Sequence, residues 1–336
     1  MSHALSDHLW RYLAGRYPGA TISDLQFVIS GWESDVYTFT LHLPTDAPKF
    51  LILRLSPGAG ASNKLIREAR GLRQLHQASY PVPAMLLHET DTAILGKPFT
   101  IMEKLEGRVL WPILAEAAPS QARHLLDRFG SLLTRLHQLD WRPFTEHAVL
   151  YETNPTAILD ELFASSRQLY TQFDVVGFLA IVDWLEIHKS DITIQPAVVH
   201  LDFHANNVFL CNDDHLAVID WTQITVSDYR ADLSWTLMIM GDFGQPHWGE
   251  QILQAYSLAA KDPVEKLDYF NVITYTKLLA STIISLRTSP KELGMRPETV
   301  ESIQQQAPIL DMLSRRIQNI TGLSIPEVET ALSQIS

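Results

Sequence analysis

Hydrophobic positions follow a strand-like period in the first third of the chain. The runs at residues 24–31, 35–43 and 49–55 are rich in β-branched and aromatic residues, and turn-forming residues separate them. This pattern predicts three consecutive antiparallel strands. A helical spacing of apolar residues precedes them at residues 5–17 and follows them at residues 63–77.

Two further strand-like runs, at residues 84–89 and 97–105, complete the β-rich segment, and beyond them the spacing becomes mostly helical. Residues 197–220 interrupt the helices with three short strand-like pieces. Later amphipathic helices are expected near residues 231–241, 248–259, 263–286, 298–320 and 326–334. The pattern predicts an α+β protein with a β-rich lobe over residues 1–104 and a larger, mostly helical lobe over residues 105–336.

Composition narrows the class of protein. The chain has 336 residues, 46% of them hydrophobic and 19% charged, which is typical of a globular protein. No apolar run is long enough for a membrane helix, and the N-terminus lacks the pattern of a signal peptide, so we expect a cytoplasmic protein without a membrane partner. The single cysteine, Cys211, excludes an intramolecular disulfide framework and a cysteine-based zinc cluster.

The net charge of −12 is unevenly distributed. Residues 1–144 hold 13 acidic and 15 basic side chains, whereas residues 145–336 hold 25 acidic and 11 basic ones. The acidic second part argues against nucleic acid as a partner, because phosphate backbones require basic surface. It would attract a small cationic molecule, although ordinary solubilising charge is the favoured explanation when the charge is considered alone.

The segment Val198–Leu210 places several ligand-capable side chains between two apolar runs. In one interpretation, His200, Asp202 and His204 alternate along one strand and bind zinc for hydrolysis. In another, Asp202 accepts a proton in phosphoryl transfer and Asn207 is an oxygen ligand for Mg²⁺.

A second acidic residue favours the magnesium interpretation. Asp220 ends a short strand-like run 18 positions after Asp202. A β-hairpin between the two segments would bring Asn207, before one strand, close to Asp220, after the other. Amide and carboxylate oxygens are suitable ligands for a hard cation, whereas a zinc site would need a further His or Cys ligand.

These residues carry a family resemblance. The pattern H-x-D-x-x-x-x-N followed by I-D-W resembles the aminoglycoside phosphotransferase and choline kinase-like family, whose members are related to the eukaryotic protein kinases. The family usually has glycine where this chain has Leu201. The resemblance implies a bilobal protein kinase-like fold, ATP or GTP as co-substrate, Asp202 as the catalytic residue, and Asn207 and Asp220 as ligands of Mg²⁺.

The resemblance extends to the nucleotide-binding lobe. It implies that Arg54, at the end of a strand, contacts the phosphates and pairs with Glu68 of the following helix. Glu103, Lys104 and Leu105 correspond to the hinge between the lobes, whose backbone would meet the purine.

The nucleotide-covering loop is the poorest match. This loop keeps one glycine, Gly31, and Ser34 would donate to a phosphate, although the acidic Asp35 beside it is unfavourable. Downstream, Asp232 is expected to support the catalytic loop through backbone hydrogen bonds, with Asp228 at the family's other acidic position. The D-F-G triplet at 242–244 lies too far from Asp202 and at the end of a helix, so we do not assign the metal to it.

The resemblance implies a small-molecule kinase, a phosphotransferase with an alcohol group as acceptor. Its acceptor would be a small hydroxyl compound like an aminoglycoside, choline or homoserine, and the acidic surplus would suit a cationic one. Tryptophans could instead line a less polar acceptor pocket. One alternative is a nucleotide-binding pseudokinase or sensor, because the loop is poor in glycine; another is the zinc-dependent hydrolase.

Overall fold

The chain folds into two compact units. The first comprises residues 1–110 and 207–224, and the second comprises residues 111–206 and 225–336. The computed structural model describes residues 2–30, 34–58, 60–288 and 307–335. Within these ranges, every helix is too short or too polar to cross a bilayer.

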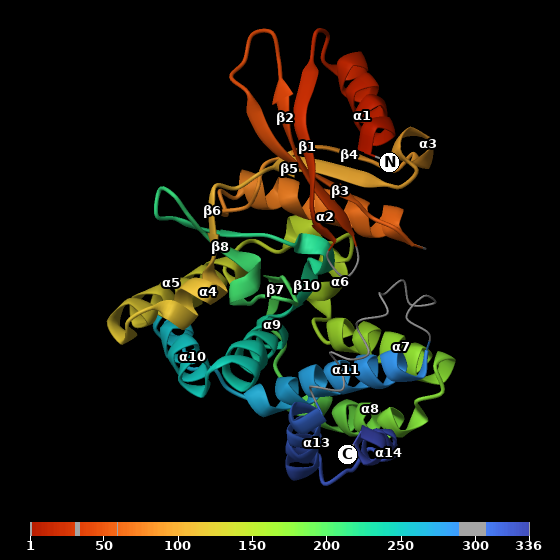
Figure 1. Cartoon of the computed structure of the whole chain (residues 1–336). Coiled ribbons are helices and arrows are strands. Elements are labelled where there is room, and N and C mark those ends of the chain that lie inside the picture. Colours follow the sequence, from red (N-terminus) through yellow and green to blue (C-terminus); the bar gives the residue numbers. More distant parts are fainter. Residues whose placement is uncertain (1, 31–33, 59, 289–306, 336) are drawn as a thin grey trace. The chain divides into compact units, whose positions relative to one another are not determined.

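An antiparallel sheet of five strands, in the order β1-β2-β3-β5-β4, forms the centre of the first unit (Figure 1). Its strands are β1 (Thr21–Ser30), β2 (Asp35–His42), β3 (Lys49–Leu55), β4 (Met85–Glu89) and β5 (Phe99–Glu103). Its helices are α1 (Ser2–Arg16), α2 (Ala61–Gln77) and α3 (Thr92–Leu95). The three consecutive antiparallel strands predicted from the hydrophobic period are confirmed.

The alternation along β3 determines what each face of the sheet contacts. Leu51, Leu53 and Leu55 are buried in a core that also contains Leu9 and Leu13 of α1. Side chains of even-numbered residues point to the opposite face. Arg54 therefore faces α2, and the position of its guanidinium follows directly from the strand period.

A second, three-stranded sheet completes the first unit. It consists of β6 (Gly107–Val109), β8 (Val208–Cys211) and β9 (Leu216–Val218), in the order β6-β8-β9. Strands β8 and β9 form the hairpin that the sequence predicted. Strand β6 was missed, because three residues are too few to show a period.

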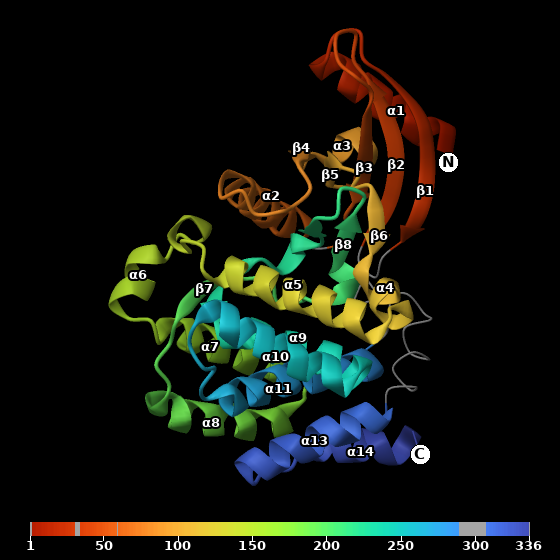
Figure 2. The same cartoon turned by 90° about the vertical axis from the view of Figure 1, so that its left-hand side faces the viewer.

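The second unit is mostly helical. Its longer helices are α5 (Pro119–His137), α7 (Ala157–Gln172), α8 (Leu179–His188), α9 (Tyr229–Leu237), α10 (Pro246–Ala260), α11 (Leu267–Arg287), α13 (Ala307–Thr321) and α14 (Pro326–Ile335). Shorter elements are α4 (Leu110–Glu116), α6 (Ala148–Thr153), β7 (Pro196–Val199), β10 (Thr225–Asp228) and a π-helix (Met238–Gly244). Helix α5 packs against α10, and α11 packs between α9 and α13 (Figure 2).

Two details differ from the sequence predictions. The expected strand through the polar cluster is wrong beyond Val199, because β7 ends there and Leu201 has a left-handed backbone with φ of 61°. His200, Asp202 and His204 therefore do not alternate along one strand. The helix expected over 298–320 is present from Ala307 onward, and its first nine positions, 298–306, lie outside the described residues.

Candidate active site

Three predicted site residues of the first unit contact one another. The guanidinium of Arg54 forms an ion pair with Glu68 of α2. Its Nη1 lies 3.5 Å from Oδ1 of Asp220. Glu68 is only 2% exposed, whereas the side chain of Asp220 is 46% exposed. The buried acid holds the cation, and the exposed acid remains accessible to a ligand.

Asn207 lies at the same end of the hairpin as Asp220. Val208 pairs with Val218 in the register of β8 and β9, and the amide of Ile219 donates to the carbonyl of Asn207 at 2.9 Å. Asp220 follows directly, with a left-handed φ of 62°. A carboxylate close to a guanidinium, with Asn207 at the same end of the hairpin, fits a magnesium–phosphate ligand, since both Mg²⁺ and cationic side chains bind phosphate oxygens.

Ser34 is described and half-buried, while Gly31, also assigned to the nucleotide-covering loop, lies outside the described residues. Asp35 is the acid whose charge appeared unfavourable near a phosphate. Its Oδ2 accepts from Nζ of Lys97 at 2.8 Å, which offsets that charge.

The predicted hinge follows the end of β5. The amide of Glu103 donates to the carbonyl of Ala84 at 2.8 Å, and the amide of Lys104 donates to the carbonyl of Phe50 at 3.0 Å. Within the described part of the chain, Leu105 is the one hinge residue whose amide takes no part in these backbone hydrogen bonds. A cavity of about 670 Å³ borders the hinge, but Arg54 and Asp220 do not line it, so it is not the phosphate site.

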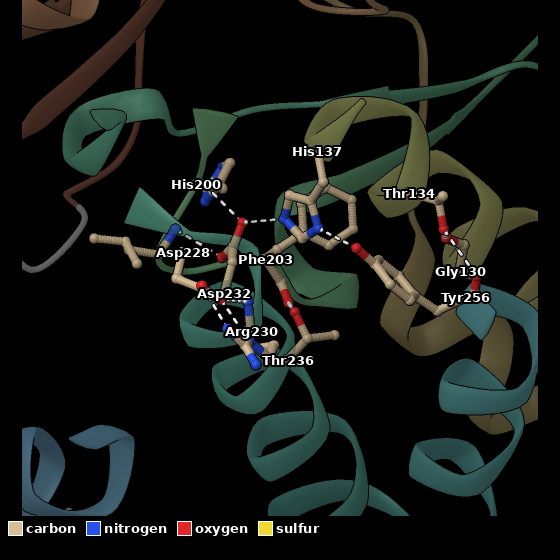
Figure 3. A network of polar contacts seen from close by, with 11 residues as sticks. Gly130, Thr134, His137, His200, Phe203, Asp228, Arg230, Asp232, Thr236 and Tyr256 are labelled. Carbon is tan, nitrogen blue, oxygen red and sulfur yellow. Dashed lines mark hydrogen bonds and ion pairs between the residues drawn. The ribbon is translucent and has the colours of Figure 1, made fainter. Parts of the chain in front are cut away.

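Asp232, at the start of α9, holds the loop that carries Asp202. The amides of His200 and Leu201 each donate to its carboxylate at 2.8 Å, as the sequence predicted (Figure 3). The left-handed conformation of Leu201 costs about 1–2 kcal/mol. Each hydrogen bond to a charged group contributes about 1.5–3 kcal/mol, so the two bonds outweigh this strain.

The same helix face holds the rest of the loop. Nε1 of Trp235 donates to Oδ1 of Asp202 at 3.0 Å, and Oγ1 of Thr236 donates to the carbonyl of Phe203 at 2.8 Å. Sδ of Met240 accepts from the amide of Ala205 at 3.4 Å. These positions follow Asp232 at intervals of three, four and eight residues, which is one stripe of a helix. Residues 200–205 are thus fixed by α9 and by the π-helix that follows it.

His204 contacts the same oxygen of Asp202. The amide of Asn206 donates to Nδ1 of His204 at 3.3 Å, which leaves Nε2 to carry a proton, and Nε2 lies 3.2 Å from Oδ1 of Asp202. Burial acts to raise the pKa of Asp202, but the hydrogen bond and charge of His204, the charge of His200 and the indole of Trp235 together lower it. The carboxylate is therefore ionised at neutral pH and oriented through Oδ1.

A chain of polar contacts supports Asp232 from behind (Figure 3). Nε2 of His137 lies 3.2 Å from Oδ2 of Asp232, and Nδ1 of the same ring lies 2.8 Å from the hydroxyl of Tyr256. Burial raises the pKa of Tyr256, so its hydroxyl stays protonated. We assign this hydroxyl as the donor to Nδ1, which leaves Nε2–H to donate to Asp232.

Asp228 stabilises the start of α9. Its carboxylate caps α9 by accepting from the amide of Arg230, and it pairs with the guanidinium of that residue at 2.8 Å. Asp228 is fully buried and Arg230 nearly so. This buried pair anchors the start of α9, and with it the helix face that holds the catalytic loop.

Other metal interpretations receive little support. His200 is fully buried against the ring of Phe203. Over the described part of the chain, the group of acidic, His and Cys side chains close enough to share an ion is Cys211, Asp213 and His215, and not the set predicted for zinc. Asp242 of the D-F-G triplet accepts from Nη1 and Nη2 of Arg316 at 2.5 and 2.9 Å, so it has a structural partner.

Several residues around Asp202 were missed by sequence reasoning. Trp235 and Thr236 could have been found from their helical spacing to Asp232. His137 and Tyr256 leave no local signal, because they lie on distant helices. Lys277 does leave one: it is the only charged residue of α11 between Asp268 and Arg287.

Comparison with known proteins decides the family. A sequence model of the phosphotransferase enzyme family matches residues 24–267. The chain belongs to this family. The structure shows the α+β architecture of this family, with an antiparallel N-terminal sheet and a helical C-terminal region.

Solved structures share this fold. A putative aminoglycoside phosphotransferase from Ralstonia eutropha has a TM-score of 0.67 at 18% identity, over 93% of this chain and 98% of the other. The ADP-bound aminoglycoside phosphotransferase APH(2'')-Ib has a TM-score of 0.59 at 18% identity, over 92% and 96%. Acyl-CoA dehydrogenase family member 10 of Mus musculus is 24% identical over 238 residues, which are 69% of this chain but 22% of that protein.

Proposed function

We propose that the chain is a small-molecule kinase that transfers the γ-phosphoryl group of ATP or GTP to a hydroxyl group. Family membership supports phosphoryl transfer. The observation that carries the proposal is the contact of Arg54 with both Glu68 and Asp220, since it joins a phosphate-binding cation to an exposed oxygen ligand. The ADP-bound relative supports a nucleotide co-substrate.

In the proposed reaction, the acceptor oxygen forms a bond to the γ-phosphorus as the bond to the β-phosphate oxygen breaks. Asp202 takes the hydroxyl proton, and the nucleoside diphosphate leaves. Arg54 binds the phosphates, Ser34 donates to one of them, and the amide of Leu105 meets the base. Asn207 and Asp220 would hold Mg²⁺, which neutralises charge on the phosphates when it is bound.

The roles of the protein are mainly to position groups and to stabilise charge. Asp202 suits the base because His204 and Trp235 orient its carboxylate, and because these two residues and His200 keep it ionised. The acceptor is a small hydroxyl compound. The acidic surplus of residues 145–336 favours a cationic one at long range, before local charges are considered.

Replacement of the base tests the proposal. Asp202→Asn should lower kcat by about 10²–10⁴-fold, because a general base contributes that much, while nucleotide affinity changes little. Transfer from ATP and GTP to a panel of hydroxyl compounds gives kcat, and isothermal titration calorimetry gives affinity. Asp183→Asn, on the exposed surface of α8 where the residue pairs with Arg167, is the matched control and should leave both unchanged.

Two results would count against a kinase. Unaltered turnover in Asp202→Asn would remove Asp202 from the mechanism. Nucleotide binding by the unmodified protein without transfer to any acceptor would instead favour the pseudokinase or sensor. Stoichiometric zinc in the purified protein, with hydrolysis that depends on it, would favour the hydrolase.

A further inference from the structure

A cavity of about 540 Å³ lies wholly within the second unit. Residues of α4, α5, the π-helix and α10 line it, and α5 packs against α10 (Figure 2). Neither Asp202 nor His204 belongs to its lining, so this cavity is separate from the proposed catalytic loop. Its volume falls in the range of about 300–1,000 Å³ that is typical of small-molecule sites.

Aromatic side chains form one wall of the cavity. The indoles of Trp111 and Trp248 pack edge to face with ring centres 5.5 Å apart, and Phe243 also lines the cavity. A Cβ added at Gly244 would lie 3.2 Å from Cη2 of Trp111 and 3.3 Å from Cε3 of Trp248, so this glycine lets both rings approach the main chain. An aromatic wall favours a ligand with a flat, apolar ring.

Two long helices begin at the cavity. Ala117 and Pro119, at the start of α5, line it, as do Gln245 and His247 at the start of α10. In both helices the N-cap side chain makes no capping hydrogen bond, and the first turn contains no acidic residue. Neither helix therefore compensates the partial positive charge of its N-terminus with a carboxylate of its own, and both N-termini favour an anion.

Arg123 adds a full positive charge. It lies in the second turn of α5, lines the cavity and is exposed. Within the described chain it has no ion-pair partner, since Asp127, one turn further along α5, accepts instead from Nε2 of Gln251 at 2.8 Å. Residues 145–336 hold 25 acidic and 11 basic side chains, yet no described acidic side chain lines the cavity. The charge at the cavity is thus positive within an acidic part of the chain.

The indole N–H groups add hydrogen-bond donors. Trp248 is only 4% exposed, and neither its N–H nor that of Trp111 has an acceptor among the described residues. A buried indole N–H usually has a hydrogen-bond partner. The lining therefore combines a guanidinium, indole donors and two helix N-termini, and the complementary ligand carries acceptor oxygens with a negative charge.

We propose that this cavity binds a small aromatic carboxylate. The ring lies against the aromatic wall of Trp111, Trp248 and Phe243, and the carboxylate faces Arg123 and the starts of α5 and α10. A planar carboxylate matches the fork of a guanidinium and accepts from backbone N–H groups as well. The site is independent of the proposed kinase function, because no residue of that mechanism lines the cavity.

Three probes with the same fused two-ring skeleton test the proposal: 2-naphthoate, the uncharged 2-naphthamide, and the saturated decahydro-2-naphthoate. Their dissociation constants for the full chain are measured by isothermal titration calorimetry and saturation-transfer NMR, without nucleotide. We expect 2-naphthoate to bind about tenfold or more tightly than 2-naphthamide, which corresponds to about 1.4 kcal/mol or more. It should also bind several-fold more tightly than the saturated acid, because a saturated ring cannot make edge-to-face contacts with the indoles.

Variants locate the binding. Arg123→Met should remove most of the preference for the carboxylate over the amide. Arg315→Met, at an exposed arginine of α13 outside the lining, is the matched control and should keep that preference. Ala115→Trp, at an exposed position of the lining, should fill the cavity and weaken the binding of both naphthyl probes about tenfold or more. Thermal unfolding verifies that each variant is folded.

Several results would overturn the proposal. These are no binding of 2-naphthoate at millimolar concentration, equal binding of the acid and the amide, equal or tighter binding of the saturated acid, a charge preference that survives Arg123→Met, or binding that Ala115→Trp leaves unchanged. Failure of the chain to transfer phosphate to any acceptor would refute the kinase and leave this site intact.

Discussion

The proposed base owes its ionisation to three side chains, His204, His200 and Trp235. Burial alone would raise the pKa of Asp202, and the opposing contribution comes first from His204 and then from weaker ones, including Trp235. A carboxylate with a lowered pKa stays charged until the pH falls below its ordinary value of about 3.9. Asp202 should therefore produce no loss of activity on acidification through the neutral range.

Removing His204 should expose the effect of burial. In His204→Leu, the pKa of Asp202 is expected to rise, so the base becomes protonated, and kcat falls, at a higher pH than in the unmodified protein. Trp235→Phe should shift the acid limb in the same direction and by less. The measurement is the pH profile of kcat, with His8→Ala on the exposed surface of α1 as control. An acid limb at the same pH in His204→Leu would contradict this assignment.

At the scale of elements, close packing of α2 against the segment after β9 determines where Glu68 lies. A Cβ added at Gly71 would meet Cδ1 and Cγ2 of Ile224 at 2.7 Å, and Ile224 is only 2% exposed. This glycine is therefore required for packing within the first unit and not for backbone freedom, since it lies inside a helix.

Two glycine-to-alanine changes should alter the free energy of unfolding in opposite directions. Gly71→Ala gains about 1 kcal/mol of helix propensity, but overpacking costs about 1–3 kcal/mol, so a net loss of stability is expected. Gly15→Ala, in α1 with no atom within 4 Å of the added Cβ, should stabilise by up to about 1 kcal/mol. Urea unfolding of both variants checks this. A stabilised Gly71→Ala would show that Ile224 can move freely.

Long elements with a clear period could be predicted from the sequence, and short or strained ones could not. The first three strands and α11 follow their hydrophobic patterns closely. Strand β10 has four residues, and the π-helix depends on an altered hydrogen-bond ladder that composition does not encode.

For the site, the spacing of Asp202, Asn207 and Asp220 was visible in the sequence, and the ion pair of Arg54 with Glu68 was expected from family resemblance. The contacts of His137 and Tyr256 depend on helix packing.

At the scale of the whole molecule, nucleotide binding should appear as added stability. A ligand that binds only the folded chain stabilises it by about 2.7 kcal/mol at one hundred times its dissociation constant. ATP with Mg²⁺ should raise the free energy of unfolding by this amount, and chelation of Mg²⁺ should reduce the gain. Urea unfolding with and without ligand is the measurement.

The control must preserve the fold while removing Arg54, the cation proposed to bind the phosphates. Arg54→Met alone would leave Glu68 buried and charged without its partner, which is strongly destabilising. The double variant Arg54→Met with Glu68→Gln avoids this and should lose most of the nucleotide-dependent gain. A full gain in the double variant would remove Arg54 from the phosphate site.

The anchoring of the catalytic loop by Asp232 bears on how this protein can diverge. The carboxylate of Asp232 accepts hydrogen bonds from main-chain amides, which every residue except proline possesses. The shape of the loop is therefore set from a position 32 residues downstream of His200, through the main chain and not through the side chains of the two residues that Asp232 binds. A leucine in place of glycine at position 201 is thus compatible with an intact loop and is no sign of a decayed enzyme. Residues that accept a left-handed backbone should be tolerated at position 201, β-branched ones should be disfavoured there, and loss of Asp232 should be penalised.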